Sequence, residues 1–82
     1  MKKVAVVSAI LEEPDKCQQA FNEVVSSFKG LVKGRMGIPF EEGMAVVCIT
    51  VVGDLDQINH LTGRLGNIAH VSVKTAISKK EI

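Results

Sequence analysis

Aromatic residues are scarce in this sequence, which has no tryptophan, no tyrosine and three phenylalanines. Since 46% of the 82 residues are hydrophobic, we expect an aliphatic core of Val, Ile, Leu and Ala to which the phenylalanines are added. A chain of this length forms one small domain, residues 1–82. Such a domain buries about 60–65% of the surface of its unfolded chain, which allows folding with a modest margin of stability.

The sequence also lacks an excess of charge of either sign. Ten Lys and Arg residues balance nine Asp and Glu residues. Proteins that bind nucleic acid without sequence preference usually have a clear basic excess. We therefore expect no direct binding of nucleic acid.

Soft metal ligands are equally few. Cys17 and Cys48 are widely separated and form no Cys-x-x-Cys pair, which argues against a disulfide framework. His60 and His70 do not complete a zinc-like spacing with them. The sequence thus predicts no metal site within one subunit and no cofactor. A cluster of Cys48 side chains across an oligomer interface is the one metal hypothesis that stays open.

Long hydrophobic runs are absent, because the longest ones reach about half the length of a membrane span. After a pair of lysines near the start, the first apolar stretch ends at Glu12 and Glu13, before a signal peptide would be complete. These observations predict a cytoplasmic protein that does not insert into a membrane.

The stretch Met44–Val52 organises the rest of the chain. Its nine residues carry no charge and are rich in β-branched side chains, and the turn signal Gly53-Asp54 follows it. A strand with one covered face alternates apolar and polar residues, whereas a strand covered on both faces is a continuous apolar run. The helices of so short a chain can cover only one face, so we expect another subunit to cover the second.

Further elements can be assigned on both sides of this strand. Pro14 suits the first position of a helix, where its missing N–H costs nothing. Lys29-Gly30 should end that helix, with Gly30 in a left-handed conformation. Asp54 and Gln57 form a capping-box pattern at the start of a second helix. The other expected elements are strands over Lys3–Leu11, Leu31–Ile38 and His70–Ser78, a loop over Pro39–Gly43, a helix stop at Gly66-Asn67 and a solvated tail over Lys79–Glu81.

The resulting element order is βαββαβ. It predicts an α+β fold of the ferredoxin-like sandwich type, in which a four-stranded antiparallel sheet has two helices on one face. Right-handed crossovers would place the first and third strands at the centre and the second and fourth at the edges.

Alternation along the strands divides their residues between the two faces of the sheet. The face away from the helices, here called the open face, should have an apolar centre flanked by cations, which is the composition of an interface. We therefore expect a homo-oligomer, a dimer or tetramer, formed through this face or an edge; the alternative is a monomer with an apolar sheet. The residues expected to face the helices are Ala5, Val7, Ala9, Val32, Met36, Ala45, Val47, Ile49, Val51, Val71, Val73 and Ile77. Those expected on the open face are Val4, Val6, Ser8, Lys33, Arg35, Val46, Cys48, Thr50, Ser72 and Lys74.

Three segments carry a resemblance to a known family: Arg35–Pro39 (RMGIP) with the strand after Gly43, Asn59–Gly66 (NHLTGRLG) and Val71–Ser78 (VSVKTAIS). Over essentially its full length the chain resembles the small ACT-like proteins known as iron-only hydrogenase system regulators. The resemblance implies an ACT-like ferredoxin fold, similar to the ligand-sensing domain of nickel-responsive repressors, and a role in regulating hydrogenase production. The His-rich, Cys-containing site of those repressors is absent here, which argues against nickel sensing.

Residues of the edge strands form the first candidate site. Lys33 and Arg35 from one edge and Lys74 from the other could bind an anionic ligand or a partner's carboxylate. The alternative is a charged edge that opposes aggregation of sheets. Gly37 either allows close backbone approach or shapes the hairpin. The full set of ligand or interface candidates is Lys33, Arg35, Met36, Gly37, Cys48 and Lys74.

The connection from Ile10 to Asp15, between the first strand and the first helix, is the second candidate region. ACT-type regulators commonly bind small effectors there, and a helix N-terminus favours anions. Glu12, Glu13 and Asp15 already bring negative charge to this position, so a cation or an amino group would fit better than an anionic effector.

The sequence contains no recognisable set of nucleophile, base and orienting group, and Gly63–Gly66 lies at a helix end rather than at the start that a phosphate loop needs. We expect a regulator without enzymatic activity, which senses a small-molecule effector or a partner protein and acts on transcription through another protein. The alternative is a structural adaptor that docks a partner protein through its open face. A ferredoxin-fold enzyme with an active site between subunits is the third hypothesis.

Overall fold

The strands and helices follow one another in the expected order. A computed structural model describes residues 1–82. Its elements are β1 (Lys3–Leu11), α1 (Pro14–Ser27), β2 (Val32–Pro39), β3 (Ala45–Gly53), α2 (Leu55–Gly66) and β4 (Val71–Glu81).

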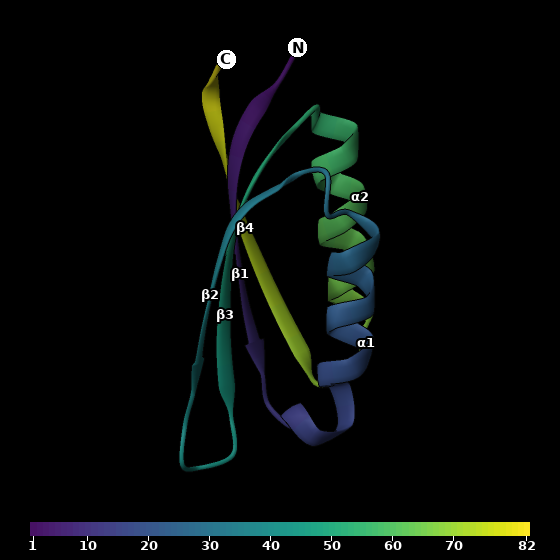
Figure 1. Ribbon diagram of the computed structural model, residues 1–82, viewed down its shortest axis with the longest axis vertical. Helices are drawn as coiled ribbons and strands as arrows, with labels where there is room; N and C mark the ends of the chain where they lie inside the picture. Colours follow the sequence, from purple (N-terminus) through teal and green to yellow (C-terminus); the bar gives the residue numbers. More distant parts are fainter.

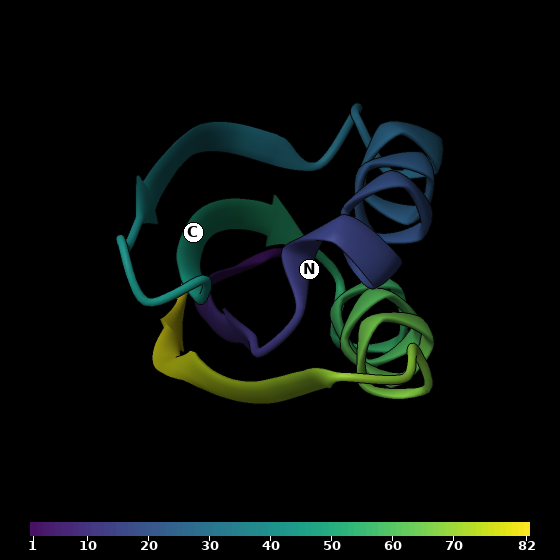
Figure 2. The same cartoon turned by 90° about the horizontal axis from the view of Figure 1, so that it is seen from below.

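All four strands form one antiparallel sheet in the order β2-β3-β1-β4. β1 and β3 are therefore central, and β2 and β4 are the edges. Both helices lie on the same side of this sheet, which leaves its other side bare (Figure 1, Figure 2). The predicted ferredoxin-like α+β fold is confirmed.

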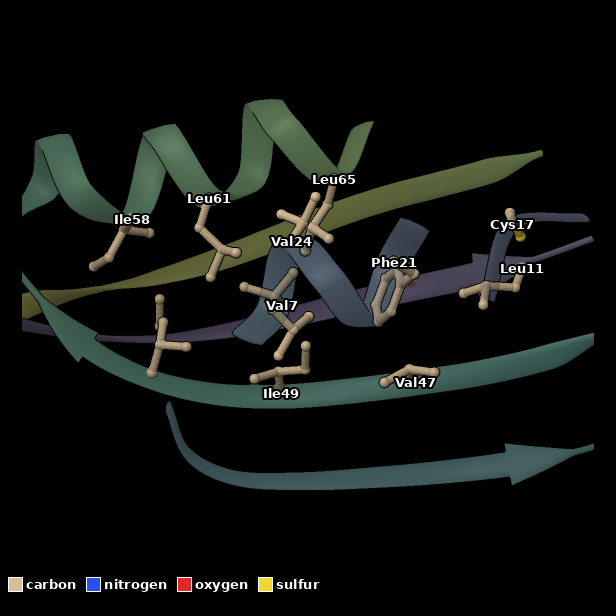
Figure 3. Packing of buried hydrophobic residues seen from close by; sticks show 14 residues of the cluster. Val7, Leu11, Cys17, Phe21, Val24, Val47, Ile49, Ile58, Leu61 and Leu65 are labelled. Carbon is tan, nitrogen blue, oxygen red and sulfur yellow. The ribbon is translucent and has the colours of Figure 1, made fainter. Parts of the chain in front are cut away.

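The core lies between the helices and the two central strands (Figure 3). Fourteen hydrophobic residues form one buried cluster there. Alternate residues of β1 and β3, such as Val7 and Ile49, enter it from the sheet, and Phe21 enters it from α1. The buried stripe of α2 consists of Ile58, Leu61 and Leu65. The edge strands contribute none of the fourteen residues; from β2 only the half-buried Val32 packs against the cluster.

The helix ends agree with the sequence signals at three of four places. Pro14 begins α1, and Asn67 caps the end of α2. The capping box at the start of α2 is confirmed: the Gln57 amide donates to Asp54 Oδ1 over 2.8 Å, and the Asp54 amide donates to Gln57 Oε1 over 3.0 Å. The left-handed conformation predicted for Gly30 is wrong. Consecutive turns end α1 instead, with hydrogen bonds from Phe28 to Val25 and from Leu31 to Phe28.

The predicted tail over Lys79–Glu81 is also wrong, because β4 continues through Glu81, which pairs with Lys3 of β1. The register between these strands shifts between Lys3 and Ala5. Ser78 bridges the irregular step: its hydroxyl accepts from the Val4 amide over 3.0 Å and donates to the Lys80 carbonyl over 2.8 Å. Backbone pairing thus extends the strand beyond its apolar alternation.

A second irregularity lies in β2 and changes which side its residues face. The register with β3 shifts between Val32, which pairs with Val51, and Gly34, which pairs with Thr50. Because side chains alternate with a period of two, an extra residue in one strand reverses the faces of all residues after it. Arg35 is therefore paired with the buried Ile49 and lies on the helix side, so its predicted place on the open face is wrong.

The same shift corrects the position of Met36. This residue pairs with Cys48 and lies on the open face, not on the helix side where simple alternation had placed it. Lys33 is the extra residue of the bulge and has no partner in the pairing of β2 with β3.

Candidate functional site

The open face is built from cross-strand rows that run over all four strands. Each row takes one residue from β2, β3, β1 and β4 in turn. The first row is Ile38, Val46, Ile10 and Ser72; the second is Met36, Cys48, Ser8 and Lys74; the third is Gly34, Thr50, Val6 and Ala76.

Large apolar side chains remain exposed in these rows. Val6 is 43% exposed, Ile10 45%, Met36 58% and Ile38 44%. Lys74 is the one charged residue among the twelve, and none is acidic. A contiguous apolar patch on a small domain is typical of a contact surface for another molecule.

The three cations predicted to act together do not converge. Lys74 lies on the open face opposite Ser8, as expected. Arg35 lies on the other side of the sheet, and Lys33 lies in the bulge. A shared anion site made by these three residues on the open face is therefore not formed within one subunit.

Instead, Arg35 forms one end of a groove on the helix side, between β2 and α1. The groove has a volume of about 410 Å³. Its residues come from both walls, from the central strands and from the β2–β3 hairpin. α1 contributes Asp15 and Gln18, β2 contributes Arg35 and Gly37, the floor includes Leu11 and Val47, and the hairpin adds Phe40 and Met44.

Two contacts fix the Arg35 guanidinium. Nη2 donates a hydrogen bond of 2.6 Å to Asn22 Oδ1 of α1. The guanidinium carbon lies 5.7 Å from the centre of the Phe21 ring, a cation–π arrangement. A guanidinium has five N–H donors, so this geometry leaves donors for a ligand. Asn22 was not singled out by sequence reasoning, because only the register shift brings Arg35 toward α1.

The three acidic residues of the β1–α1 connection have different surroundings. Glu13 binds Lys16 Nζ at 3.3 Å and His70 Nδ1 at 3.1 Å. The Glu12 amide donates to the His70 carbonyl over 2.9 Å. Asp15 lines the groove. No three His, Cys, Asp or Glu side chains gather where they could hold a metal ion.

His70 has a positive φ of 70°, which is uncommon for a residue with a side chain. Its contacts with Glu12 and Glu13 hold it at the start of β4. They thereby fasten the β1–α1 connection to the edge of the sheet.

The two cysteines lie in different environments. Cys17 is buried on α1, where desolvation raises the pKa of its thiol, which donates a hydrogen bond to the Glu13 carbonyl. Cys48 is half-buried on the open face beside Met36. Both thiols are free. Neither helix has the length and apolar character of a membrane span.

Comparison with known proteins gives a family and a close structural relative. A family model described as "TM1266-like: Iron-only hydrogenase system regulator, putative" matches residues 3–75. The structure of the uncharacterized protein TM1266 from Thermotoga maritima is 32% identical, with a TM-score of 0.91, over 96% of this chain and 100% of that one.

A more distant likeness is limited to the fold. The C-terminal domain of the MgtC protein from Mycobacterium tuberculosis is 11% identical, with a TM-score of 0.71, over 98% of this chain and 92% of that one. No curated protein matches significantly. The family match covers most of the chain and its description names a regulator, so the protein belongs to the TM1266-like family of iron-only hydrogenase system regulators.

Proposed function

We propose that this protein is a non-enzymatic regulator of the iron-only hydrogenase system that works as a homo-oligomer joined through its open face. In that assembly it senses a small effector or a partner protein in the cytoplasm. The family description supports the regulatory role. The composition of the open face supports the oligomer.

The four exposed apolar side chains of the open face carry this proposal. Burying an aliphatic side chain fully contributes about 1.5–3 kcal/mol, so covering four half-exposed ones contributes about 3–6 kcal/mol per subunit. The total stability of a small domain is about 5–15 kcal/mol. A second copy of the same face offers the same apolar rows and buries both sets at once.

Light scattering over a dilution series tests the assembly. The wild-type protein should have the mass of a dimer or tetramer, and Ile10→Glu should make it monomeric by placing a charge in the first row. Leu55 is the matched control, because it is 46% exposed but lies on α2. Leu55→Glu should leave the mass unchanged. A wild-type monomer at every concentration would contradict the oligomer.

One observation favours a second candidate, an adaptor that docks a partner protein through the open face. Lys74 has no carboxylate beside it in the rows, and a second copy would bring only another lysine. A partner with an acidic residue would pair with it. If the protein is monomeric and binds such a partner with a dependence on Lys74, the adaptor is the better description.

The hydrogenase role itself needs a test in cells. Deleting the gene in its host should change the amount of iron-only hydrogenase, measured as transcript and as hydrogen-evolving activity. Unchanged transcript and activity under conditions that induce the enzyme would overturn the proposed function.

A further inference from the structure

We propose that the groove between β2 and α1 binds a short linear peptide of about three residues, with its carboxylate at Arg35 and its amino group at Asp15. The proposal rests on the sensing role above and gives the effector a chemical class. It depends on the register shift in β2, which places Arg35 on this side of the sheet.

Arg35 provides the carboxylate end of the site. Its guanidinium is oriented by Asn22 and supported by the face of Phe21. A planar guanidinium binds a carboxylate through two parallel hydrogen bonds. Because two protein contacts already fix the side chain, little further conformational entropy is lost when a ligand binds.

Asp15 provides the amino end of the site. It lies in the first turn of α1, where it also lines the groove. Asp15 and Arg35 are the only charged residues of the groove, one on each wall. A ligand with both an ammonium and a carboxylate can pair with both, whereas a simple anion would be repelled by Asp15.

The spacing of these groups sets the length of the ligand. Asp15 and Asn22 are seven residues apart on α1, which corresponds to about 10 Å along the helix axis. Arg35 is bonded to Asn22, so its guanidinium lies near the far end of this interval. The ammonium and carboxylate of a free α-amino acid are one carbon apart and cannot reach both. An extended peptide spans about 3.3–3.6 Å per residue, so three residues match the interval.

The middle of the groove suits a peptide backbone with small apolar side chains. Gln18 lies one turn after Asp15 on α1, and its side-chain amide can both donate and accept hydrogen bonds. Opposite it, Gly37 leaves its backbone open, because a Cβ there would meet no atom within 4 Å. Val47 and Leu11 supply an apolar floor. The volume of about 410 Å³ lies in the range of small-ligand sites.

Isothermal titration with trialanine and three matched compounds tests the proposal. N-acetyl-trialanine lacks the ammonium, trialanine amide lacks the carboxylate, and alanine has both groups but not the length. Trialanine should bind saturably, and each of the other three should bind at least about tenfold more weakly. Absence of saturable binding by trialanine would overturn the proposal, as would equal binding by any of the other three compounds.

Variants locate the binding on the protein. Arg35→Gln and Asp15→Asn should each weaken trialanine binding about tenfold. Gly37→Leu should abolish trialanine binding, because the leucine side chain fills the groove while the charges of Arg35 and Asp15 are kept. Loss of binding in this variant cannot come from a folding defect caused by the absence of Arg35. Lys33→Gln is the control, because it removes a neighbouring cation that lies outside the groove. Unchanged binding by Gly37→Leu would contradict the site.

Light scattering on the same samples separates this proposal from the function on which it rests. An oligomer that binds no trialanine would end the peptide proposal and leave the regulatory assembly standing. A monomer that binds trialanine with the expected dependence on Arg35 would support the site and contradict the assembly.

Discussion

Arg35 of β2 and Asn22 of α1 are joined by a hydrogen bond of 2.6 Å that connects an edge strand to the helix layer. From Lys33 onward every residue of β2 is exposed, so few buried side chains hold this strand in place. The same guanidinium lies over Phe21, which is buried in the core. Backbone pairing with β3 places β2 at the edge of the sheet, and the Arg35 side chain adds its connection to α1.

A double-mutant cycle should reveal this connection as a coupling in stability. Arg35→Ala and Asn22→Ala should each lower the free energy of unfolding, and the double variant should lose less than their sum. The hydrogen bond is exposed, so we expect a coupling of about 0.5–1 kcal/mol, measured by urea unfolding. The cycle of Lys33→Ala with Asn22→Ala is the control and should be additive. Additivity in both cycles would contradict the contact.

The fold was predictable because its signals are local and repeat along the chain. Continuous apolar runs indicated the central strands, and Asp54 with Gln57 marked the start of α2 by their spacing alone. The core stripe of α1 followed from helical periodicity. These signals do not depend on how distant segments align, and the structure agrees with them.

The groove was not predictable because it depends on how two strands align rather than on a local signal. A bulge is a property of the pairing between two strands, and its one signal in the sequence, Gly34 inside the strand, does not show which residue is the extra one. Missing it placed Arg35 and Met36 on the wrong faces and hid the contact with Asn22. The error in Lys79–Glu81 has a similar origin, since backbone pairing with β1 and the Ser78 hydroxyl extend β4 without an apolar pattern.

The register shift itself can be tested with a disulfide. Met36 lies directly opposite Cys48, and such pairs in antiparallel sheets have Cα atoms about 4.5–5.5 Å apart, a separation that a disulfide spans. Met36→Cys should therefore form an intramolecular bond with Cys48 on mild oxidation, seen by mass spectrometry as a loss of two hydrogen atoms.

Arg35→Cys is the matched control for this experiment. Its side chain points to the helix side, so no bond to Cys48 should form within one chain. Bond formation by Arg35→Cys and not by Met36→Cys would show that β2 pairs with β3 without the register shift, with residue 35 on the open face. Oxidation at high dilution keeps bonds between chains from confusing the result.

Gly53 at the end of β3 should tolerate no larger residue without loss of stability. A Cβ at this position would lie 2.9 Å from Gln57 Oε1 and 3.1 Å from Leu31 Cδ2. Moving Gln57 away breaks one arm of the capping box, so Gly53→Ala should cost about 1 kcal/mol, measured by urea unfolding. Gly37→Ala is the control, because its Cβ would meet no neighbour, and it should cost much less.

The cause of that loss can be isolated in a second background. In Gln57→Ala the arm of the capping box is already missing, so adding Gly53→Ala should have a smaller effect than in the wild type. An equal cost in both backgrounds would show that Leu31, rather than the cap, opposes the added methyl group.

Burial of Cys17 should make the protein less stable at alkaline pH. Desolvation raises the pKa of this thiol above its ordinary value of 9.0. The folded state then holds the proton while the unfolded chain releases it, so the contribution is complete below pH 9.0 and is lost as the pH rises toward the folded pKa. Urea midpoints measured from neutral pH to about pH 10 should fall more steeply for the wild type than for Cys17→Ala.

Cys48→Ala is the control for this pH dependence, and it should follow the wild-type profile. Apart from the two cysteines, all three proteins have the same titratable groups, so the difference between the wild-type and Cys17→Ala profiles belongs to Cys17. A thiol reagent provides an independent reading: Cys48 should react in the folded protein, whereas Cys17 should react only at the rate at which the core opens. Parallel pH profiles for the wild type and Cys17→Ala would show that this thiol keeps its ordinary pKa in the folded state.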